Sequence, residues 1–160
     1  MRQSPVRLIL SAALLAMPAA ALAQAKTVEI DTEAVVAACG GEFSAADTGA
    51  MSKAELSKRL ACVIREAGKS LQAQLPMKVD ALTTLQRVST EELMFTYHYD
   101  VDLLRSDVAA GAFESVRAAV REKVCNDPNM RNTIGLGGSY RYLWNDRKGE
   151  QLGELTVSSC

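Results

Sequence analysis

Residues 125–160, CNDPNMRNTIGLGGSYRYLWNDRKGEQLGELTVSSC, decide the fold of this chain. Asp127-Pro128 is typical of a helix start, because aspartate caps a helix and proline suits its first position. We therefore predict a short helix over residues 127–134. Alternating side chains over residues 138–146, a turn, and an apolar return segment over residues 151–158 predict two strands joined in a hairpin. Cysteines at both ends of the stretch are expected to fasten helix and hairpin together.

The four cysteines of the chain predict two disulfides. Cys39, Cys62, Cys125 and Cys160 all follow the N-terminal segment, and an even number in an exported chain is typical of disulfide bonding. Four cysteines allow three pairings, of which sequence order favours Cys39–Cys62 and Cys125–Cys160. Metal binding is the competing interpretation, but the chain has no Cys-x-x-Cys pair and a single histidine. We expect no metal and no cofactor.

The first 23 residues have the features of a secretory signal peptide. Arg2 and Arg7 form a basic segment before an apolar run over residues 8–17. Ala21-Leu22-Ala23 has the small-x-small pattern that signal peptidase recognises. The run is short for a membrane anchor, which needs roughly 20 apolar residues. We expect cleavage after Ala23 and a periplasmic or secreted domain over residues 24–160, without a lipidated cysteine or a membrane span.

Charge and length limit the classes of function. Loss of Arg2 and Arg7 lowers the basic residues from 18 to 16 against 19 acidic ones, so the formal net charge moves from −1 to −3. A mildly acidic chain lacks the electrostatic footprint of a protein that binds nucleic acid or an anionic membrane. Removing 23 of the 160 residues leaves 137, the size of one ordinary domain.

Upstream of residue 125 the pattern alternates between helical and strand periods. Ser52-Lys53-Ala54-Glu55 fits a capping box, and apolar residues then recur at helical spacing until Pro76. A short helix is expected before it, over residues 33–38. Residues 79–88 and 93–101 predict two strands in a second hairpin. A further helix is expected from Ser106 or Asp107 to Val124, with an apolar stripe of Phe113, Val116, Val120 and Val124.

These elements predict an α+β domain. Two hairpins imply antiparallel pairing, so we expect a four-stranded antiparallel sheet with the helices mainly on one face. Two disulfides would staple this domain together.

Three stretches resemble a group of small exported bacterial proteins, mostly of unassigned function. They are Leu75-Pro76-Met77-Lys78-Val79-Asp80, the strand Phe95-Thr96-Tyr97-His98-Tyr99, and the cysteine-bounded segment that contains Gly138-Ser139-Tyr140-Arg141-Tyr142. The shape is similar to that of pilotins of the type II secretion system and of quorum-sensing-regulated secreted factors. The resemblance covers residues 75–160, and its motifs are structural rather than catalytic.

Alternation along two strands predicts a cluster of aromatic side chains. Phe95, Tyr97 and Tyr99 share one face of the first strand, and Tyr140, Tyr142 and Trp144 share one face of the second. These residues can form core beneath the helices, or an exposed surface for a partner. Arg141 can anchor such a partner or can be a solvated strand charge. The candidate binding surface is Tyr97, Tyr99, Tyr140, Arg141, Tyr142 and Trp144.

The sequence favours binding over catalysis. His98 and Asp100 share a strand face and could act in acid–base chemistry, but a histidine with no catalytic role is the preferred interpretation. The glycines between Gly135 and Gly138 lack the lysine of a phosphate loop and predict a turn. We expect a non-enzymatic protein that binds another envelope or secreted protein, for example in an envelope or secretion assembly. The alternative is a pocket between sheet and helices for a small ligand or an envelope polymer.

Overall fold

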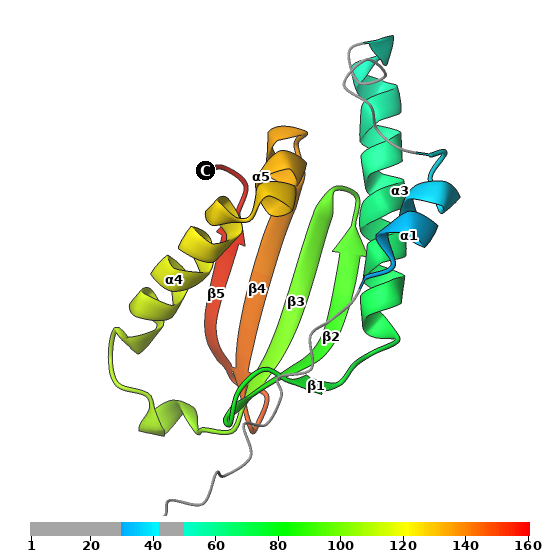
Figure 1. Cartoon of the computed structure of the whole chain (residues 1–160). Coiled ribbons are helices and arrows are strands. Elements are labelled where there is room, and N and C mark those ends of the chain that lie inside the picture. The colour runs from blue at the N-terminus through cyan, green and yellow to red at the C-terminus, as the bar shows by residue number, and fades with distance from the viewer. Residues whose placement is uncertain (1–29, 42–49) are drawn as a thin grey trace, which may run out of the picture.

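The computed structural model describes residues 30–41 and 50–160, so the predicted signal peptide and its cleavage site lie outside the described residues. Figure 1 shows helices lying over one face of a single sheet. The elements, in chain order, are α1 (Thr32–Ala38), α3 (Lys53–Gln72), β1 (Met77–Lys78), β2 (Thr83–Glu91), β3 (Met94–Val101), a 3₁₀ turn (Arg105–Asp107), α4 (Ala112–Asn126), α5 (Pro128–Gly135), β4 (Ser139–Asp146) and β5 (Gln151–Val157).

The sheet has five strands in the order β1-β2-β3-β4-β5 and is mixed, which corrects the predicted four-stranded antiparallel sheet. Both predicted hairpins are confirmed, because β2–β3 and β4–β5 pair antiparallel. The hairpins meet through β3 and β4, which run parallel and in register. A parallel pair needs a long crossover connection, and the 37 residues between Val101 and Ser139, which include α4 and α5, supply it.

The additional strand, β1, arises from a tight turn where the sequence predicted continuous strand. The Oδ1 atom of Asp80 accepts hydrogen bonds from the amides of Leu82 and Thr83, both at 2.8 Å. An aspartate that bonds the backbone two or three residues on is typical of turns. The chain therefore reverses at Asp80, and Met77–Lys78 pairs antiparallel with the start of β2.

Three of the four helices, α1, α3 and α5, begin with a side-chain cap, and α1 is capped by Asp31, which accepts a hydrogen bond from the amide of Ala34. The predicted capping box opens α3, with Ser52 and Glu55 bonding each other's amides. Asp127 caps α5 as predicted, and Pro128 is its first residue. The predicted start of α4 at Ser106 or Asp107 is wrong. Gly111 has a φ of 79°, and this left-handed conformation separates the 3₁₀ turn from a helix that begins at Ala112.

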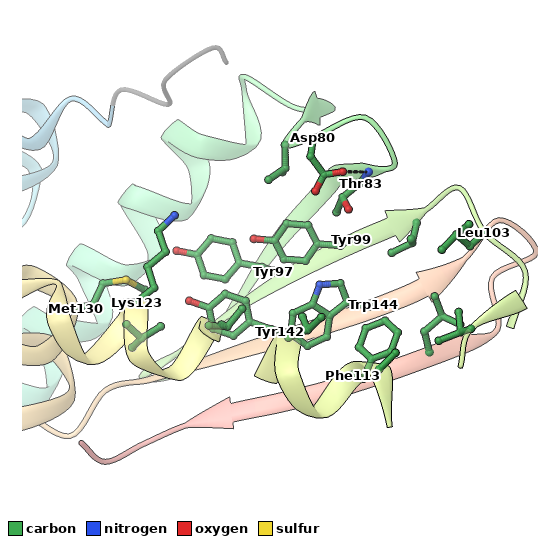
Figure 2. A pocket seen from close by; sticks show the side chains of 18 of the residues that line it. Asp80, Thr83, Tyr97, Tyr99, Leu103, Phe113, Lys123, Met130, Tyr142 and Trp144 are labelled. Carbon is green, nitrogen blue, oxygen red and sulfur yellow. Dashed lines mark hydrogen bonds between the residues drawn. The ribbon is translucent and has the colours of Figure 1, made fainter. Parts of the chain in front are cut away.

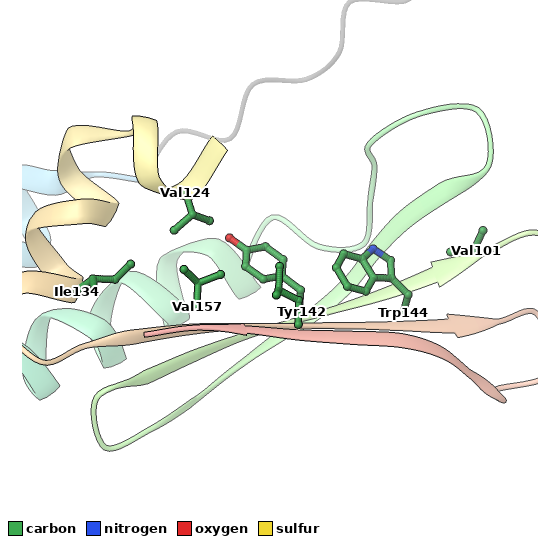
Figure 3. Close-up of a cluster of buried hydrophobic side chains, with 7 residues drawn as sticks. Val101, Val124, Ile134, Tyr142, Trp144 and Val157 are labelled. Atoms are coloured by element: carbon green, nitrogen blue, oxygen red, sulfur yellow. The ribbon is translucent and has the colours of Figure 1, made fainter. Parts of the chain in front are cut away.

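The core consists of two apolar clusters on the same face of the sheet. One joins α3 to β2 and the start of β3 through residues such as Leu60, Ile64 and Leu85. The other joins α4 and α5 to β4 and β5 through Val124, Ile134, Tyr142, Trp144, Leu155 and Val157, together with Val101 from β3 (Figure 3). Tyr97, Tyr99 and Tyr140 contact both clusters. The prediction that the helices lie mainly on one face is therefore confirmed.

Both disulfides form with the pairing that sequence order favours. Cys39–Cys62 ties α1 to α3, and Cys125–Cys160 ties the last turn of α4 to the C-terminus beyond β5. Arg59 of α3 reinforces the first connection by donating hydrogen bonds to the carbonyls of Cys39, Gly40 and Gly41. One disulfide thus joins the two N-terminal helices, and the other joins α4 to the chain end that follows β5.

Candidate functional site

An apolar groove of about 600 Å³ lies over the middle of the sheet. It is bounded by α4 on one side and by the turn between β1 and β2 on the other, and strands β3 and β4 form its floor (Figure 2). Most of the side chains that line it are apolar or aromatic: Val79, Tyr97, Tyr99, Val101, Leu103, Val108, Ala112, Phe113, Val116, Val120, Val124, Met130, Tyr142, Trp144 and Leu152. Its volume is in the range of ligand-binding clefts.

The floor of the groove is a stack of aromatic rings. The parallel register of β3 and β4 places Tyr97 beside Tyr142 and Tyr99 beside Trp144. The ring centroids of Tyr97 and Tyr142 are 5.0 Å apart with planes 15° from parallel, and those of Tyr99 and Trp144 are 6.0 Å apart at 16°. Stacked rings at these distances attract each other, and this attraction adds to the free energy gained by burying their apolar surface. The floor is therefore a continuous aromatic platform.

The wall formed by α4 uses the predicted helical stripe. Phe113, Val116, Val120 and Val124 recur every three or four residues, so they share one face of the helix. Phe113 packs at an angle of 55° against Trp144, with centroids 5.8 Å apart. Gly153 of β5 makes this approach possible, because a Cβ at that position would lie 2.7 Å from Cδ1 of Phe113. The stripe thus contacts the sheet at its ends and borders the groove in between.

The rim of the groove exposes large apolar side chains to solvent. Val79 is 48% exposed on one wall and Val116 is 38% exposed on the other. Two further exposed apolar residues, Leu82 and Leu136, do not line the groove. Exposed apolar side chains gathered at one groove are a mark of a surface that binds a partner or a ligand.

The polar groups of the groove are the hydroxyls of three tyrosines and of Thr83, the indole NH of Trp144, and three charged side chains. Figure 2 shows the hydroxyls of Tyr97, Tyr99 and Tyr142 pointing toward the end of the groove where Lys123 and Met130 lie. Within the described residues, none of these hydroxyls has a hydrogen-bond partner. The charged residues that line the groove are Lys123, Asp80 and Asp127.

Burial changes the acidity of the floor tyrosines. It raises the pKa of Tyr99 to about 12. Burial, reinforced by the neighbouring tyrosines and Asp127, raises the pKa of Tyr97 and Tyr142 well above the usual range. All three hydroxyls therefore stay protonated at neutral pH and are available as hydrogen-bond donors inside the groove.

The structure brings four of the six predicted binding residues together. Tyr97, Tyr99, Tyr142 and Trp144 line the groove, with Tyr142 and Trp144 only 7% and 5% exposed. These four side chains face the helices, as expected if they form core. The helices do not cover all of them, however, and the groove lies over the uncovered part. Tyr140 does not line the groove; it packs near Phe95, with centroids 6.5 Å apart.

Arg141 is placed elsewhere. Strand alternation puts it on the face of the sheet away from the helices, where its Nε donates to Oε1 of Glu154 at 2.7 Å. It stays a predicted binding residue that the groove does not include.

The face away from the helices also holds the residues considered for catalysis. The Nε2 atom of His98 lies 2.9 Å from Oγ of Ser89. Burial lowers the pKa of His98, and Arg87 and Arg141 lower it further. The hydrogen bond between neutral His98 and Ser89 joins the neighbouring strands β3 and β2. It lies outside the groove. In the described part of the chain, no group of three or more histidine, cysteine or acidic residues is placed to hold a metal ion.

Several residues of the groove were not named from the sequence as binding residues. Lys123, Met130, Leu103 and Val108 line it, but they lie on segments whose place relative to β3 and β4 depends on the crossover. The apolar stripe of α4 was recognised, although such a stripe looks the same whether it faces a core or an open groove.

Fold and site together define a class: a disulfide-stapled α+β domain with helices over one face of a mixed sheet and an aromatic-floored groove between them. Among residues 30–41 and 50–160, no helix has the length and apolar character that crossing a membrane requires.

Solved structures of the same fold include a candidate secreted protein and two pilotins. The candidate secreted protein, from Pseudomonas aeruginosa, has a TM-score of 0.57 at 16% identity, over 64% of this chain and 91% of its own. EpsS, the pilotin of the Vibrio vulnificus type 2 secretion system, has a TM-score of 0.57 at 18% identity, over 66% and 94%. AspS, the type II secretion pilotin of Vibrio cholerae, has a TM-score of 0.54 at 18% identity, over 66% and 94%.

No family model and no curated protein sequence matches the chain. At 16–18% identity, the structural likeness shows the fold alone. The predicted resemblance to pilotins and to small secreted proteins is confirmed at that level.

Proposed function

We propose that this protein is a non-enzymatic, exported binding protein that holds an apolar segment of a partner protein in the groove between α4 and the β1–β2 turn. The observation that carries the proposal is the aromatic floor of Tyr97, Tyr99, Tyr142 and Trp144 beneath a rim of exposed valines. Burying such a surface against a partner is favourable, since apolar area removed from water contributes about 25 cal/mol per Å².

The partner segment is an α-helix rather than an added strand. Adding a strand requires free backbone groups at an edge of the sheet. Gln72 of α3 accepts a hydrogen bond from the amide of Val88 in β2 at 2.9 Å. At the other edge, Arg117 donates to the carbonyl of Glu154 at 3.0 Å, and Arg105 donates to that of Gln151 at 2.6 Å. Side chains therefore occupy backbone groups on both outer sides of the sheet.

The groove lies on the face of the sheet that the helices cover, beside α4. Figure 1 shows α3 beside β2 and α4 beside β5, with β3 and β4 between them. A helix with its side chains is about 10 Å across, and the groove offers it apolar walls and an aromatic floor. Amphipathic helices commonly bind in grooves of this kind, with their apolar stripe facing inward.

The setting we propose is the cell envelope, after removal of the signal peptide at Ala23. Disulfides form and persist in oxidising compartments such as the periplasm or outside the cell, and both disulfides of this protein are formed. Two proteins of the same fold are pilotins of type II secretion systems. These likenesses support a partner in a secretion or envelope assembly.

A second candidate function is the binding of a small apolar ligand or an envelope polymer. The volume of about 600 Å³ favours it, because clefts of this size hold small molecules. Thermal unfolding of the purified protein with peptidoglycan fragments, fatty acids and small metabolites separates the two candidates. A large rise in melting temperature with one of these compounds, without capture of a protein, would favour the second.

The test of the leading proposal is affinity capture from the native envelope with three forms of the tagged protein. Val116→Glu places a charge on the rim of the groove, and Leu136→Glu places the same charge at an equally exposed site outside it; both residues are 38% exposed. Because both side chains face solvent, both variants should fold. We expect wild type and Leu136→Glu to capture the same partner and Val116→Glu to lose it. Equal capture by both variants would contradict the location of the site.

A further inference from the structure

One end of the groove gathers hydrogen-bond donors that the protein itself does not use. The hydroxyls of Tyr97, Tyr99 and Tyr142 point toward the end where Lys123 lies (Figure 2). Within the described residues, neither these hydroxyls nor the ammonium group of Lys123 has a hydrogen-bond or ion-pair partner. Lys123 forms no ion pair with Asp127 there, although the two residues lie one helical turn apart.

The two acidic residues of the groove, unlike Lys123, form hydrogen bonds with the protein backbone. The Oδ1 atom of Asp127 accepts hydrogen bonds from the amides of Asn129 and Met130 at 2.8 and 3.0 Å, so it caps the start of α5. The Oδ1 atom of Asp80, on the opposite wall, is likewise bonded to two backbone amides. One oxygen of each carboxylate is thus bonded to backbone amides of the fold, whereas the ammonium group of Lys123 and the hydroxyls remain available to a ligand.

We infer that the groove recognises an amphipathic helix that carries an acidic side chain at the Lys123 end, where Lys123 and the hydroxyls of Tyr97 and Tyr142 receive its carboxylate. This inference rests on the proposed function and adds the orientation of the partner to it. A carboxylate that accepts from an ammonium and two hydroxyls in a largely apolar groove forms charge-assisted hydrogen bonds, which are stronger than neutral ones. Lys123 is the one basic residue that lines the groove, so its position fixes the direction in which the helix lies.

The test uses a display library of helical peptides with a constant apolar stripe and randomised flanking positions. Three forms of the protein serve as bait: wild type, Lys123→Glu and Arg121→Glu. Lys123 and Arg121 are both exposed residues of α4, but only Lys123 lines the groove. The two substitutions therefore make the same change of charge on the same helix. Binding of selected peptides is measured through the fluorescence of Trp144, the single tryptophan of the chain, on the floor of the groove.

We expect peptides selected on wild type to carry aspartate or glutamate at one fixed position beside the stripe. Their affinity should fall by about tenfold or more on Lys123→Glu, the size of one partly buried charge contact, and by less than about twofold on Arg121→Glu. Peptides selected on Lys123→Glu should carry lysine or arginine at that position.

The outcomes separate this inference from the proposed function. Peptides that bind in the groove without an acidic preference, or equally well to Lys123→Glu, would overturn the inference and leave helix binding standing. If no peptide binds in a manner that Val116→Glu abolishes, both proposals fail. Binding of decanoate in place of any peptide would assign the cationic end to a free fatty acid and would overturn the inference.

Discussion

Replacing Gly153 by alanine tests whether this glycine makes room for Phe113 of α4 against the sheet. Gly153 is buried opposite Trp144 in the β4–β5 ladder. A Cβ at Gly153 would lie 2.7 Å from Cδ1 and 3.0 Å from Cγ of Phe113. Carbon atoms pack at about 3.5–4.0 Å, so the ring and the first turn of α4 would have to move away from the sheet.

The expected change in stability combines two opposing effects. Overpacking costs about 1–3 kcal/mol, whereas alanine in place of a strand glycine recovers roughly 0.5–1 kcal/mol of backbone entropy. The free energy of unfolding should therefore fall by up to about 2.5 kcal/mol. Urea unfolding followed by circular dichroism measures it. Gly135→Ala is the matched control, because a Cβ there meets nothing within 4 Å, and it should leave stability unchanged or raise it.

A double-mutant cycle identifies the cause of the loss. In a Phe113→Ala background the ring that meets the new Cβ is gone, so Gly153→Ala should be neutral or mildly stabilising. The two substitutions should therefore be non-additive, as expected for residues in direct contact. An equal loss in both backgrounds would refute the reasoning, because Phe113 would then not be the group that Gly153 accommodates.

Three further predictions concern the scaffold around the groove. Cys125→Ser should free Cys160 for thiol titration and lower the free energy of unfolding by about 4 kcal/mol in the chain-entropy model, since the disulfide spans 35 residues; an unchanged urea midpoint would contradict this. Burial raises the pKa of Tyr99 to about 12, against about 10 when unfolded, so its stabilising effect is complete below pH 10 and is lost as the pH rises through 12. Urea titrations in this window should show a loss of stability to which Tyr99 contributes about 2–3 kcal/mol, in addition to the contributions of Tyr97 and Tyr142; the loss in Tyr99→Phe should be smaller by that amount. Asp127→Ala removes the cap of α5 and should cost about 1 kcal/mol; equal urea midpoints for the variant and wild type would show that the cap does not contribute.

Features encoded by neighbouring residues could be predicted from the sequence, and long-range strand order could not. The capping box at Ser52 and the Asp127-Pro128 start are local hydrogen-bond chemistry, and both occur as predicted. The parallel pairing of β3 with β4 depends on a crossover of 37 residues, whose path no local pattern specifies. The predicted start of α4 was wrong because Ser106 and Asp107 both have side chains that can cap a helix. The left-handed backbone of Gly111 instead delays the start of the helix to Ala112.

For the site, the alternation of side chains along the strands predicted which residues lie together. The helical periodicity of α4 did not predict which of its residues line an open groove. Alternation grouped Tyr97, Tyr99, Tyr142 and Trp144 correctly, since side chains on one strand face stay together whatever the strand order. The same rule places Arg141 on the opposite face, one residue away from Tyr142. The stripe of α4 predicted a buried helix face, but exposure of Val116 depends on how far α4 stands from β3, which is a tertiary property.

Under the proposed function, the groove must stay open in water and still bind an apolar partner. Tyrosine side chains in the floor would allow both. A floor of phenylalanine would present only apolar surface when empty, which favours aggregation. Tyrosine combines an apolar ring with a hydroxyl that water can solvate, and in this floor the rings stack while the hydroxyls share one direction. When a helix covers the floor, those hydroxyls lose water and need new acceptors, because an unsatisfied buried hydroxyl is costly. Under the proposed function, a partner that supplies acceptors at the Lys123 end should therefore bind better than a purely apolar one, and the floor would select among helices that fit equally well by shape.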